Sequence, residues 1–329
     1  MPLYLIRFPL GPLPTTLLEC MIGTLVVIWI VRDNHFFPTL GSLWRHHRFL
    51  AVFLFLFLTA ATISIFVSGN LRAAAGIWRA YFIEPALVFL VAFDVLRTKE
   101  QLSRVICASA TSALIVATIA VYQRFTGWHI PAPWLSELRV TSVYSYPNAV
   151  GLYLAPIIPL CVVQFFDSLK SHKSRAYAAL YACAGMVSLL AIYFAKTEAA
   201  LVALAVVLPL MGLIWSMKTR LATMVVCAAL SAIIFATPGL SASIQEKLSL
   251  RDWSGQVRQK IWKETRAMLA DRTVFGAGLA GYQQAIEPYH KAKHLEIFLY
   301  PHNIALNFWT ETGLLGFFSF ILIVLSLFF

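Results

Sequence analysis

The stretch FLAVFLFLFLTAATISIFV at residues 49–67 decides the fold of this chain. It carries no charged residue, and a helix of this length covers roughly the ~30 Å hydrocarbon core of a bilayer. Apolar runs of similar length recur at 14–31, 77–96, 103–122, 147–166, 176–195, 199–216, 221–237 and 304–329. The pattern predicts an all-α polytopic membrane protein with about nine transmembrane helices.

The composition supports the same fold class. The chain is 60% hydrophobic with a mean hydropathy of +0.75. Only 12% of its residues are charged, against roughly 25% in an ordinary soluble domain. The net charge is +11, but the Lys and Arg residues lie in short clusters between apolar runs, where topology signals lie. This distribution argues against a nucleic-acid partner and for a membrane as the partner surface.

The short linkers that are richest in Lys and Arg alternate along the chain with poorer ones. The richer linkers lie at residues 32–48, 97–104, 170–175 and 218–220. The positive-inside rule places them in the cytoplasm and leaves residues 123–146, 196–198 and 238–301 outside. The N-terminus also falls outside, which suggests a missing upstream span or a re-entrant segment. The apolar end at 317–329 suggests that the chain is a fragment of a longer protein.

We therefore expect three parts along the chain. Residues 1–237 form a transmembrane helical bundle with eight spans, and residues 238–301 form an external loop domain. Residues 302–329 carry a sequence motif and the last transmembrane helix.

The external loop has a pattern of its own. Residues 254–270, SGQVRQKIWKETRAMLA, predict an amphipathic helix. The expected apolar face comprises Val257, Ile261, Trp262, Thr265, Met268 and Leu269. The following residues 275–282, FGAGLAGY, predict a tight turn rather than a phosphate-binding loop, because no βαβ pattern surrounds them. His290 and His294 are four residues apart, which is compatible with a metal-binding pair and equally with a solvated helix face.

A polar cluster marks the start of the last apolar run, in YPHNIALNFWTETGLLG at residues 300–316. Polar groups at a bilayer boundary are costly to desolvate, so they are candidates for function. An interfacial histidine is often only a hydrogen-bonded structural group, but His302 has a particular setting. Four external cations, if they converge on it, provide charge for a diphosphate beside a group that accepts a proton near neutral pH. These cations are Arg139, Lys196, Arg258 and Arg266.

Two of these positions also have simpler interpretations. Lys196 joins two apolar runs with almost no loop between them, so its ammonium group either extends to the membrane surface or reaches an anion. The segment from Arg139 to Asn148 contains Tyr144 and Tyr146, and with Trp134 these residues can form an ordinary aromatic belt at headgroup level.

Four segments resemble the bacterial O-antigen ligase and O-antigen polymerase (Wzy-like) family, and they occur in that family's order. They are RVTSVYSYPNAVGLYL at 139–154, FAKTEAALVALAV at 194–206, SGQVRQKIWKETRAML followed by TVFGAGLAGYQ between 254 and 283, and YPHNIALNFWTETGLLG at 300–316. Two positions depart from the family pattern. Lys196 stands where the family usually has Arg, and Thr273-Val274 replaces its Pro-Leu.

The resemblance implies a GT-C-like, metal-independent glycosyltransferase on the outer face of the bacterial cytoplasmic membrane, with no cofactor. Its donor is a glycan carried on a polyprenyl diphosphate. Its acceptor is a sugar hydroxyl, on lipid A–core in a ligase or on a second lipid-linked glycan in a polymerase. A transporter or flippase of lipid-linked glycans is the alternative, although a long external loop with its own helix exceeds what alternating access requires.

The resemblance also implies roles for individual residues. His302 is the expected general base and Arg258 the expected catalytic cation, since a departing diphosphate needs fixed positive charge. Asn303 and Glu311 are expected to orient His302 or to help hold the end of the helix. The expected substrate-binding residues are Arg139, Lys196, Arg266, Asn148, Asn303 and Glu311.

Overall fold

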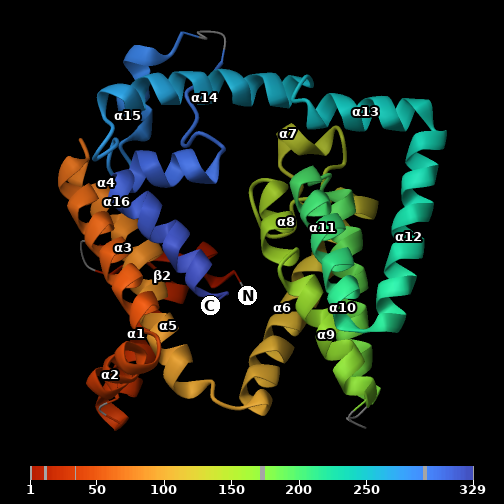
Figure 1. Cartoon of the computed structure of the whole chain (residues 1–329), viewed down its shortest axis with the longest axis horizontal. Helices are drawn as coiled ribbons and strands as arrows, with labels where there is room; N and C mark the ends of the chain where they lie inside the picture. The colour runs from red at the N-terminus through yellow and green to blue at the C-terminus, as the bar shows by residue number, and fades with distance from the viewer. Residues whose placement is uncertain (1, 11–12, 34, 171–174, 292–294, 329) are drawn as a thin grey trace. The chain divides into compact units, whose positions relative to one another are not determined.

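The computed structural model describes residues 2–10, 13–33, 35–170, 175–291 and 295–328, which are mostly helical (Figure 1). The chain divides into two compact units. The central unit is Leu96–Thr237, and the terminal unit combines Pro2–Val95 with Pro238–Phe329. The three-part division expected from the sequence follows the order of the chain and stays a prediction.

Eight helical segments of the described residues are long and apolar enough to cross a membrane. They are Arg48–Val67, Leu71–Val95, Lys99–Thr126, Asn148–Lys170, Arg175–Phe194, Glu198–Trp215, Met217–Ala236 and Ile304–Ser326. Each corresponds to one of the predicted runs, so the prediction of an all-α polytopic membrane protein is confirmed.

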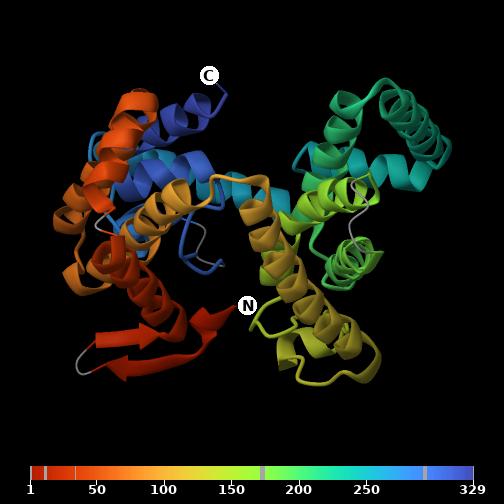
Figure 2. The same cartoon turned by 90° about the horizontal axis from the view of Figure 1, so that it is seen from below.

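The first predicted run differs from the other eight. Its apolar helical part, Leu17–Val31, is shorter than these spans, and it belongs to helix α1 (Leu17–Asp33). The residues before α1 form a small antiparallel hairpin of β1 (Arg7–Leu10) and β2 (Leu13–Thr16), drawn in red in Figure 2. The hairpin therefore takes the first residues of the predicted run at 14–31.

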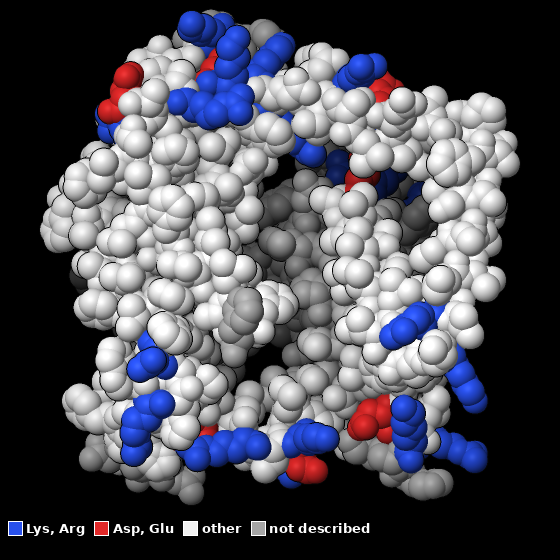
Figure 3. All heavy atoms as spheres, in the orientation of Figure 1, with Lys and Arg blue, Asp and Glu red and all other residues white. Residues whose placement is uncertain are grey.

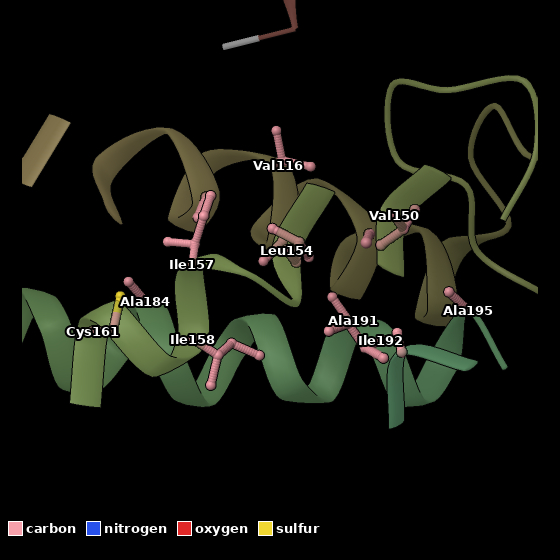
Figure 4. Packing of buried hydrophobic residues seen from close by; sticks show 14 of the residues in the cluster. Val116, Val150, Leu154, Ile157, Ile158, Cys161, Ala184, Ala191, Ile192 and Ala195 are labelled. Atoms are coloured by element: carbon pink, nitrogen blue, oxygen red, sulfur yellow. The ribbon is translucent and has the colours of Figure 1, made fainter. Parts of the chain in front are cut away.

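The central unit is a bundle of α-helices. These are α6 (Lys99–Thr126), the short α7 (Ala132–Leu135), α8 (Asn148–Leu154), α9 (Ile157–Lys170), α10 (Arg175–Phe194), α11 (Glu198–Trp215) and α12 (Met217–Ala236). Its core is a cluster in which Val116, Leu154 and Ile192 interlock with small residues such as Ala184 and Ala191 (Figure 4). Alanines allow helix backbones to approach closely, which is how transmembrane helices pack without a hydrophobic driving force between them.

The terminal unit brings the two ends of the chain together. After the 3₁₀ turn η1 (Leu3–Leu5) and α1 come α2 (Phe36–His46), α3 (Arg48–Val67), α4 (Leu71–Trp78), the π-helical η2 (Arg79–Ile83) and α5 (Glu84–Val95). The later helices are α13 (Pro238–Leu248), α14 (Trp253–Asp271), α15 (Tyr282–Ile286), the 3₁₀ turn η3 (Glu287–Tyr289) and α16 (Ile304–Ser326). Helix α16 packs on α3, where Phe308 lies between Phe57 at 5.7 Å and Phe320 at 4.0 Å, measured between ring centroids.

Charge is distributed as the membrane assignment requires. In each unit, the Lys, Arg, Asp and Glu side chains visible in Figure 3 lie toward the ends of the helices, and the band between them carries few charges. Within the terminal unit, basic side chains gather over α14 (Figure 3). This helix belongs to the predicted external loop.

Candidate functional site

His302 lies in a short turn that is held on both sides. Its backbone has φ +51°, a left-handed conformation that is uncommon for a residue other than glycine. On one side, the indole nitrogen of Trp262 donates a hydrogen bond to the carbonyl oxygen of Pro301 at 2.9 Å. On the other side, Asn303 caps α16, because its Oδ1 accepts from the Leu306 N–H at 3.1 Å. A residue in such a conformation persists only where the surrounding structure fixes it, as it does here.

The imidazole of His302 is partly exposed and packs edge-on against two aromatic rings. Its ring centroid lies 5.2 Å from that of Phe298 and 4.8 Å from that of Tyr300. Within the described residues, neither ring nitrogen makes a hydrogen bond. Partial burial of the ring, and after it the positive charge of Arg258, lower the pKa of His302 below its ordinary value of 6.5. At neutral pH the ring is therefore uncharged and can accept a proton.

Two of the predicted site residues, Arg258 and Arg266, lie on α14. The predicted helix 254–270 is confirmed as α14, which starts after Asp252, whose carboxylate accepts the Gly255 N–H at 3.2 Å. The buried face comprises Gly255, Ile261, Thr265, Met268 and Leu269. Arg258 and Arg266 are exposed. Arg266 lines an open hollow of about 460 Å³ together with Gln256, Gln259, Lys260, Trp262 and Lys263.

The residues expected to orient His302 are engaged elsewhere. Asn303 uses its side-chain oxygen to cap α16. Glu311 accepts a hydrogen bond from the side-chain amide of Asn307 at 3.4 Å. In the described part of the chain, no hydrogen bond joins either side chain to the imidazole, so an orienting role for both stays a prediction.

The glycine-rich turn has a structural task that the sequence analysis did not foresee. Helix α16 is broken at Gly313, which has φ +65°. In an unbroken helix the N–H of Leu314 would donate to the carbonyl of Thr310. Instead it donates to the carbonyl of Val274 at 2.9 Å, while the Thr310 carbonyl accepts from the N–H of Ala277 at 2.6 Å. The turn thus satisfies both backbone groups that the break releases.

Only glycine fits at the closest point of this contact. Gly276 has φ +66°, and a Cβ atom there would collide with the carbonyl oxygens of Trp309 and Thr310. The indole nitrogen of Trp309 adds a further bond to the Thr273 carbonyl at 2.7 Å. The prediction of a tight turn at 275–282 is consistent with this geometry, and the turn joins α14 to the break that follows Glu311.

The central unit brings three of the predicted residues together. Arg139 donates from Nε to the carbonyl of Ala195 at 2.8 Å. Its Nη2 donates to Oδ1 of Asn148 at 3.0 Å and to the Lys196 carbonyl at 3.3 Å. The guanidinium group also lies over the ring of Trp134, 5.1 Å from its centroid. Nη1 makes no hydrogen bond to any described residue, so one edge of the guanidinium group stays available.

Lys196 is neither buried nor isolated. Its Nζ lies 3.0 Å from Oε2 of Glu137, and the two side chains are 55% and 61% exposed. An ion pair this exposed is screened by water and contributes little stability, so an anionic ligand can displace the carboxylate.

Gln123 is a functional candidate that the sequence analysis missed. It is 0% exposed and holds the loop that carries Arg139. Its side-chain oxygen accepts the N–H groups of Thr141 at 3.1 Å and Ser142 at 2.7 Å, and its amide donates to the Ser142 carbonyl at 2.9 Å. The only sequence signal was an uncharged polar residue near the end of an apolar run.

The proposed histidine pair divides into a buried residue and one outside the described part of the chain. His290 is buried, with Nδ1 3.0 Å from Oε2 of Glu264 and Nε2 3.1 Å from the Leu295 carbonyl oxygen. The solvated-face interpretation is therefore wrong for His290. His294 lies outside the described residues, and no group of three potential metal-ligating side chains occurs among those described.

The predicted residues thus form two groups. Arg139, Asn148 and Lys196 belong to the central unit, and Arg258, Arg266, His302, Asn303 and Glu311 belong to the terminal unit. The convergence of the two groups on one substrate stays a prediction.

Comparison with known proteins identifies one family. Residues 183–321 match the family model described as O-antigen ligase. The match includes three of the four segments that carry the resemblance, and 139–154 lies before it. No curated protein and no solved structure matches the chain.

Proposed function

We propose, from the premise that the chain belongs to the O-antigen ligase family through residues 183–321, a specific glycosyl transfer reaction. Membership of this family implies a membrane enzyme of glycosyltransferase type. In the proposed reaction, a glycan moves from a polyprenyl diphosphate to a sugar hydroxyl on the outer face of the bacterial cytoplasmic membrane. The acceptor is lipid A–core if the enzyme is a ligase and a second lipid-linked glycan if it is a polymerase.

The observation that carries this proposal is the state of His302. Its ring nitrogens make no hydrogen bond within the described residues, its pKa is lowered, and its backbone is anchored on both sides. A general base needs an uncharged nitrogen within reach of the hydroxyl, and such a base contributes about 10²–10⁴-fold to the rate. His302 takes the proton of the acceptor hydroxyl as its oxygen bonds to the anomeric carbon and the bond from that carbon to the diphosphate breaks.

The arginines serve the leaving group. The departing diphosphate gains negative charge in the transition state, and fixed guanidinium groups stabilise it best in a site of low dielectric constant. Arg258 and Arg266 provide exposed guanidinium groups on α14, and Arg258 is close enough to influence the pKa of His302. Since side chains supply this charge, the proposal includes no metal ion.

The central unit contributes a second cationic group. The guanidinium of Arg139 is fixed by Ala195 and Asn148, and the ammonium of Lys196 lies on the loop that Arg139 contacts. We assign these two cations to the diphosphate or to an anionic group of the glycan.

The test is a transfer assay with the full chain in proteoliposomes. The donor is a polyprenyl-diphosphate-linked glycan, offered with and without lipid A–core, and products are separated by size. We expect His302→Ala and Arg258→Gln to abolish most transfer, and Lys247→Gln, on the neighbouring α13, to retain it. A single-step shift on lipid A–core identifies a ligase, and a ladder without it identifies a polymerase. Transfer that His302→Ala leaves intact contradicts the proposed base, and no transfer by folded protein with any donor favours a transporter.

A further inference from the structure

An apolar groove opens in the central unit between α9, α11 and the start of α12. It has a volume of about 260 Å³ and is lined by Val162, Phe166, Leu208, Met211, Trp215 and Thr219, together with Gly212. The core of the unit is tightly packed near the other end of α11, where Ala200 and Leu204 are buried (Figure 4 shows the neighbouring core). The groove is open to the surroundings, and covering its apolar walls with an apolar group from outside the chain is favourable.

The lining determines that this occupant is apolar. The polar groups of the lining are the Thr219 hydroxyl, which already donates to the Ser216 carbonyl at 2.9 Å, and the indole N–H of Trp215. A bound water needs two to four polar partners, and the groove does not offer them. A hydrocarbon chain fits, because it replaces no hydrogen bond and gains dispersion contacts with Phe166, Leu208 and Met211.

The mouth of the groove is positively charged. The ammonium of Lys170 lies 5.8 Å from the centroid of the Trp215 ring, which itself packs against Phe166 at 6.1 Å. Lys218 and Arg220 flank Thr219 and are exposed. Asp167 is the one acidic residue of α9, and α12 has none, so basic residues outnumber acidic ones on these two helices.

An occupant of the groove would also affect how helix α12 packs. None of its residues is buried, and its contacts are with α11. The two helices meet closely at Gly212, where a Cβ atom would collide with the hydroxyl of Thr223. A chain lying in the groove extends this contact surface by filling the space between α9 and the α11–α12 pair.

We propose that the groove binds an anionic phospholipid, with one acyl chain along Phe166, Leu208 and Met211 and the phosphate at Lys170, Lys218 and Arg220. Basic pockets between transmembrane helices on the cytoplasmic side recognise anionic headgroups, and these linkers are the ones predicted to be cytoplasmic. The polyprenyl donor is the less fitting occupant, since Lys196 lies at the opposite end of α11, roughly 27 Å away along the helix axis. The inference does not depend on glycosyl transfer.

The experiment measures lipid retention and thermal stability of the full-length protein. Protein stripped of lipid in detergent is supplied with phosphatidylglycerol or phosphatidylcholine of identical acyl chains. Bound lipid is counted by native mass spectrometry, and unfolding is followed by intrinsic fluorescence. We expect selective retention of phosphatidylglycerol and a higher Tm with it. Lys170→Gln and Arg220→Gln are each expected to weaken that retention roughly fivefold, from the contribution of one basic residue to anionic lipid binding.

Two further variants separate the acyl chain from the charge. Val162→Trp fills the groove and is expected to remove the bound lipid while the basic residues remain. Arg104→Gln removes a charge from α6, which does not line the groove, and is expected to change nothing. Equal retention of the two lipids, unchanged retention in Lys170→Gln and Arg220→Gln, or displacement of phosphatidylglycerol by an equimolar polyprenyl phosphate would each overturn the proposal.

Discussion

The turn that carries His302 and the loop that carries Arg139 position their key residues in opposite ways. The imidazole of His302 is left without a hydrogen bond within the described residues, and only the backbone around it is fixed. The guanidinium of Arg139 is itself fixed, by three hydrogen bonds and an aromatic ring. A group that must take up a proton needs a free nitrogen, whereas a group that provides constant charge benefits from rigidity. We therefore predict that His302 is a reacting group and that Arg139 provides fixed charge.

The largest expected loss of transfer activity follows from removing the imidazole of His302. We expect His302→Ala and His302→Gly to lose about 10²–10⁴-fold in transfer rate, which is the range for a general base. Alanine keeps the Cβ atom that histidine has at φ +51°, whereas glycine adopts this conformation without strain, so the pair separates loss of the ring from an effect of the backbone. Equal losses in the two variants, with unchanged Tm, assign the effect to the ring. Recovery of activity in His302→Gly alone would show that the turn matters and the imidazole does not.

Replacing Gln123 tests whether its hydrogen bonds hold the loop that carries Arg139. Gln123→Leu eliminates three hydrogen bonds and leaves the N–H groups of Thr141 and Ser142 buried without partners. We expect the free energy of unfolding to fall by about 2–6 kcal/mol, at 1–3 kcal/mol for each of the two unsatisfied N–H groups. The measurement is denaturation in detergent, with transfer assayed at a temperature where the variant is folded.

A matched control is available on a neighbouring helix. Gln164 accepts one hydrogen bond, from the hydroxyl of Ser103 at 3.2 Å. Gln164→Leu should cost about 1 kcal/mol, as expected for a single bond. Equal destabilisation by the two substitutions would mean that Gln123 has no special part in holding the loop.

The pH dependence of transfer sharpens the assignment of His302. The rate should rise with pH as the imidazole loses its proton, with a midpoint below 6.5 because burial and Arg258 lower its pKa. Arg258→Gln removes a positive charge that disfavours the imidazolium, so the pKa of His302 rises and the midpoint moves to higher pH. Arg258→Lys keeps the charge and should keep the midpoint. If the original protein, Arg258→Gln and Arg258→Lys all have the same midpoint, the group that titrates in the pH profile is not His302.

Much of this architecture follows from local sequence pattern. Eight of the nine predicted runs are candidate spans, because a long and mostly apolar helix is what a bilayer crossing needs. The helix at 254–270 follows from the spacing of its apolar residues, of which Ile261 and Leu269 are buried. The short hairpin before Leu17 gave no such signal, because its strands are four residues each and contain prolines.

For the candidate site, the sequence predicts which residue types take part but not how they contact one another. The roles of His302 and Arg258 are predicted from residue type and position and stay predictions. The contact of Val274 and Ala277 with the broken helix at Gly313 joins backbone groups far apart in the chain. Backbone contacts carry no side-chain signature beyond the glycines that permit them. The buried pairing of His290 with Glu264 was missed for another reason: the two side chains meet only through the tertiary fold, because they are 26 residues apart in the chain.

The smallest expected effect concerns Lys196 and its exposed partner. Glu137→Gln should change the free energy of unfolding by less than about 1 kcal/mol, because an ion pair this exposed is heavily screened. If Lys196 binds the donor, loss of the competing carboxylate should lower the KM for the donor by no more than about fivefold, since an exposed pair is rarely worth more than ~1 kcal/mol. Lys196→Gln should raise that KM, and Lys196→Arg should lower it, because a guanidinium can bind a phosphate through two parallel hydrogen bonds. Unchanged KM values in all three variants would show that Lys196 does not bind the donor. Arg139, whose guanidinium is fixed by hydrogen bonds, would then be the remaining candidate cation of the central unit, and the exposed ammonium of Lys196 would have no role in binding.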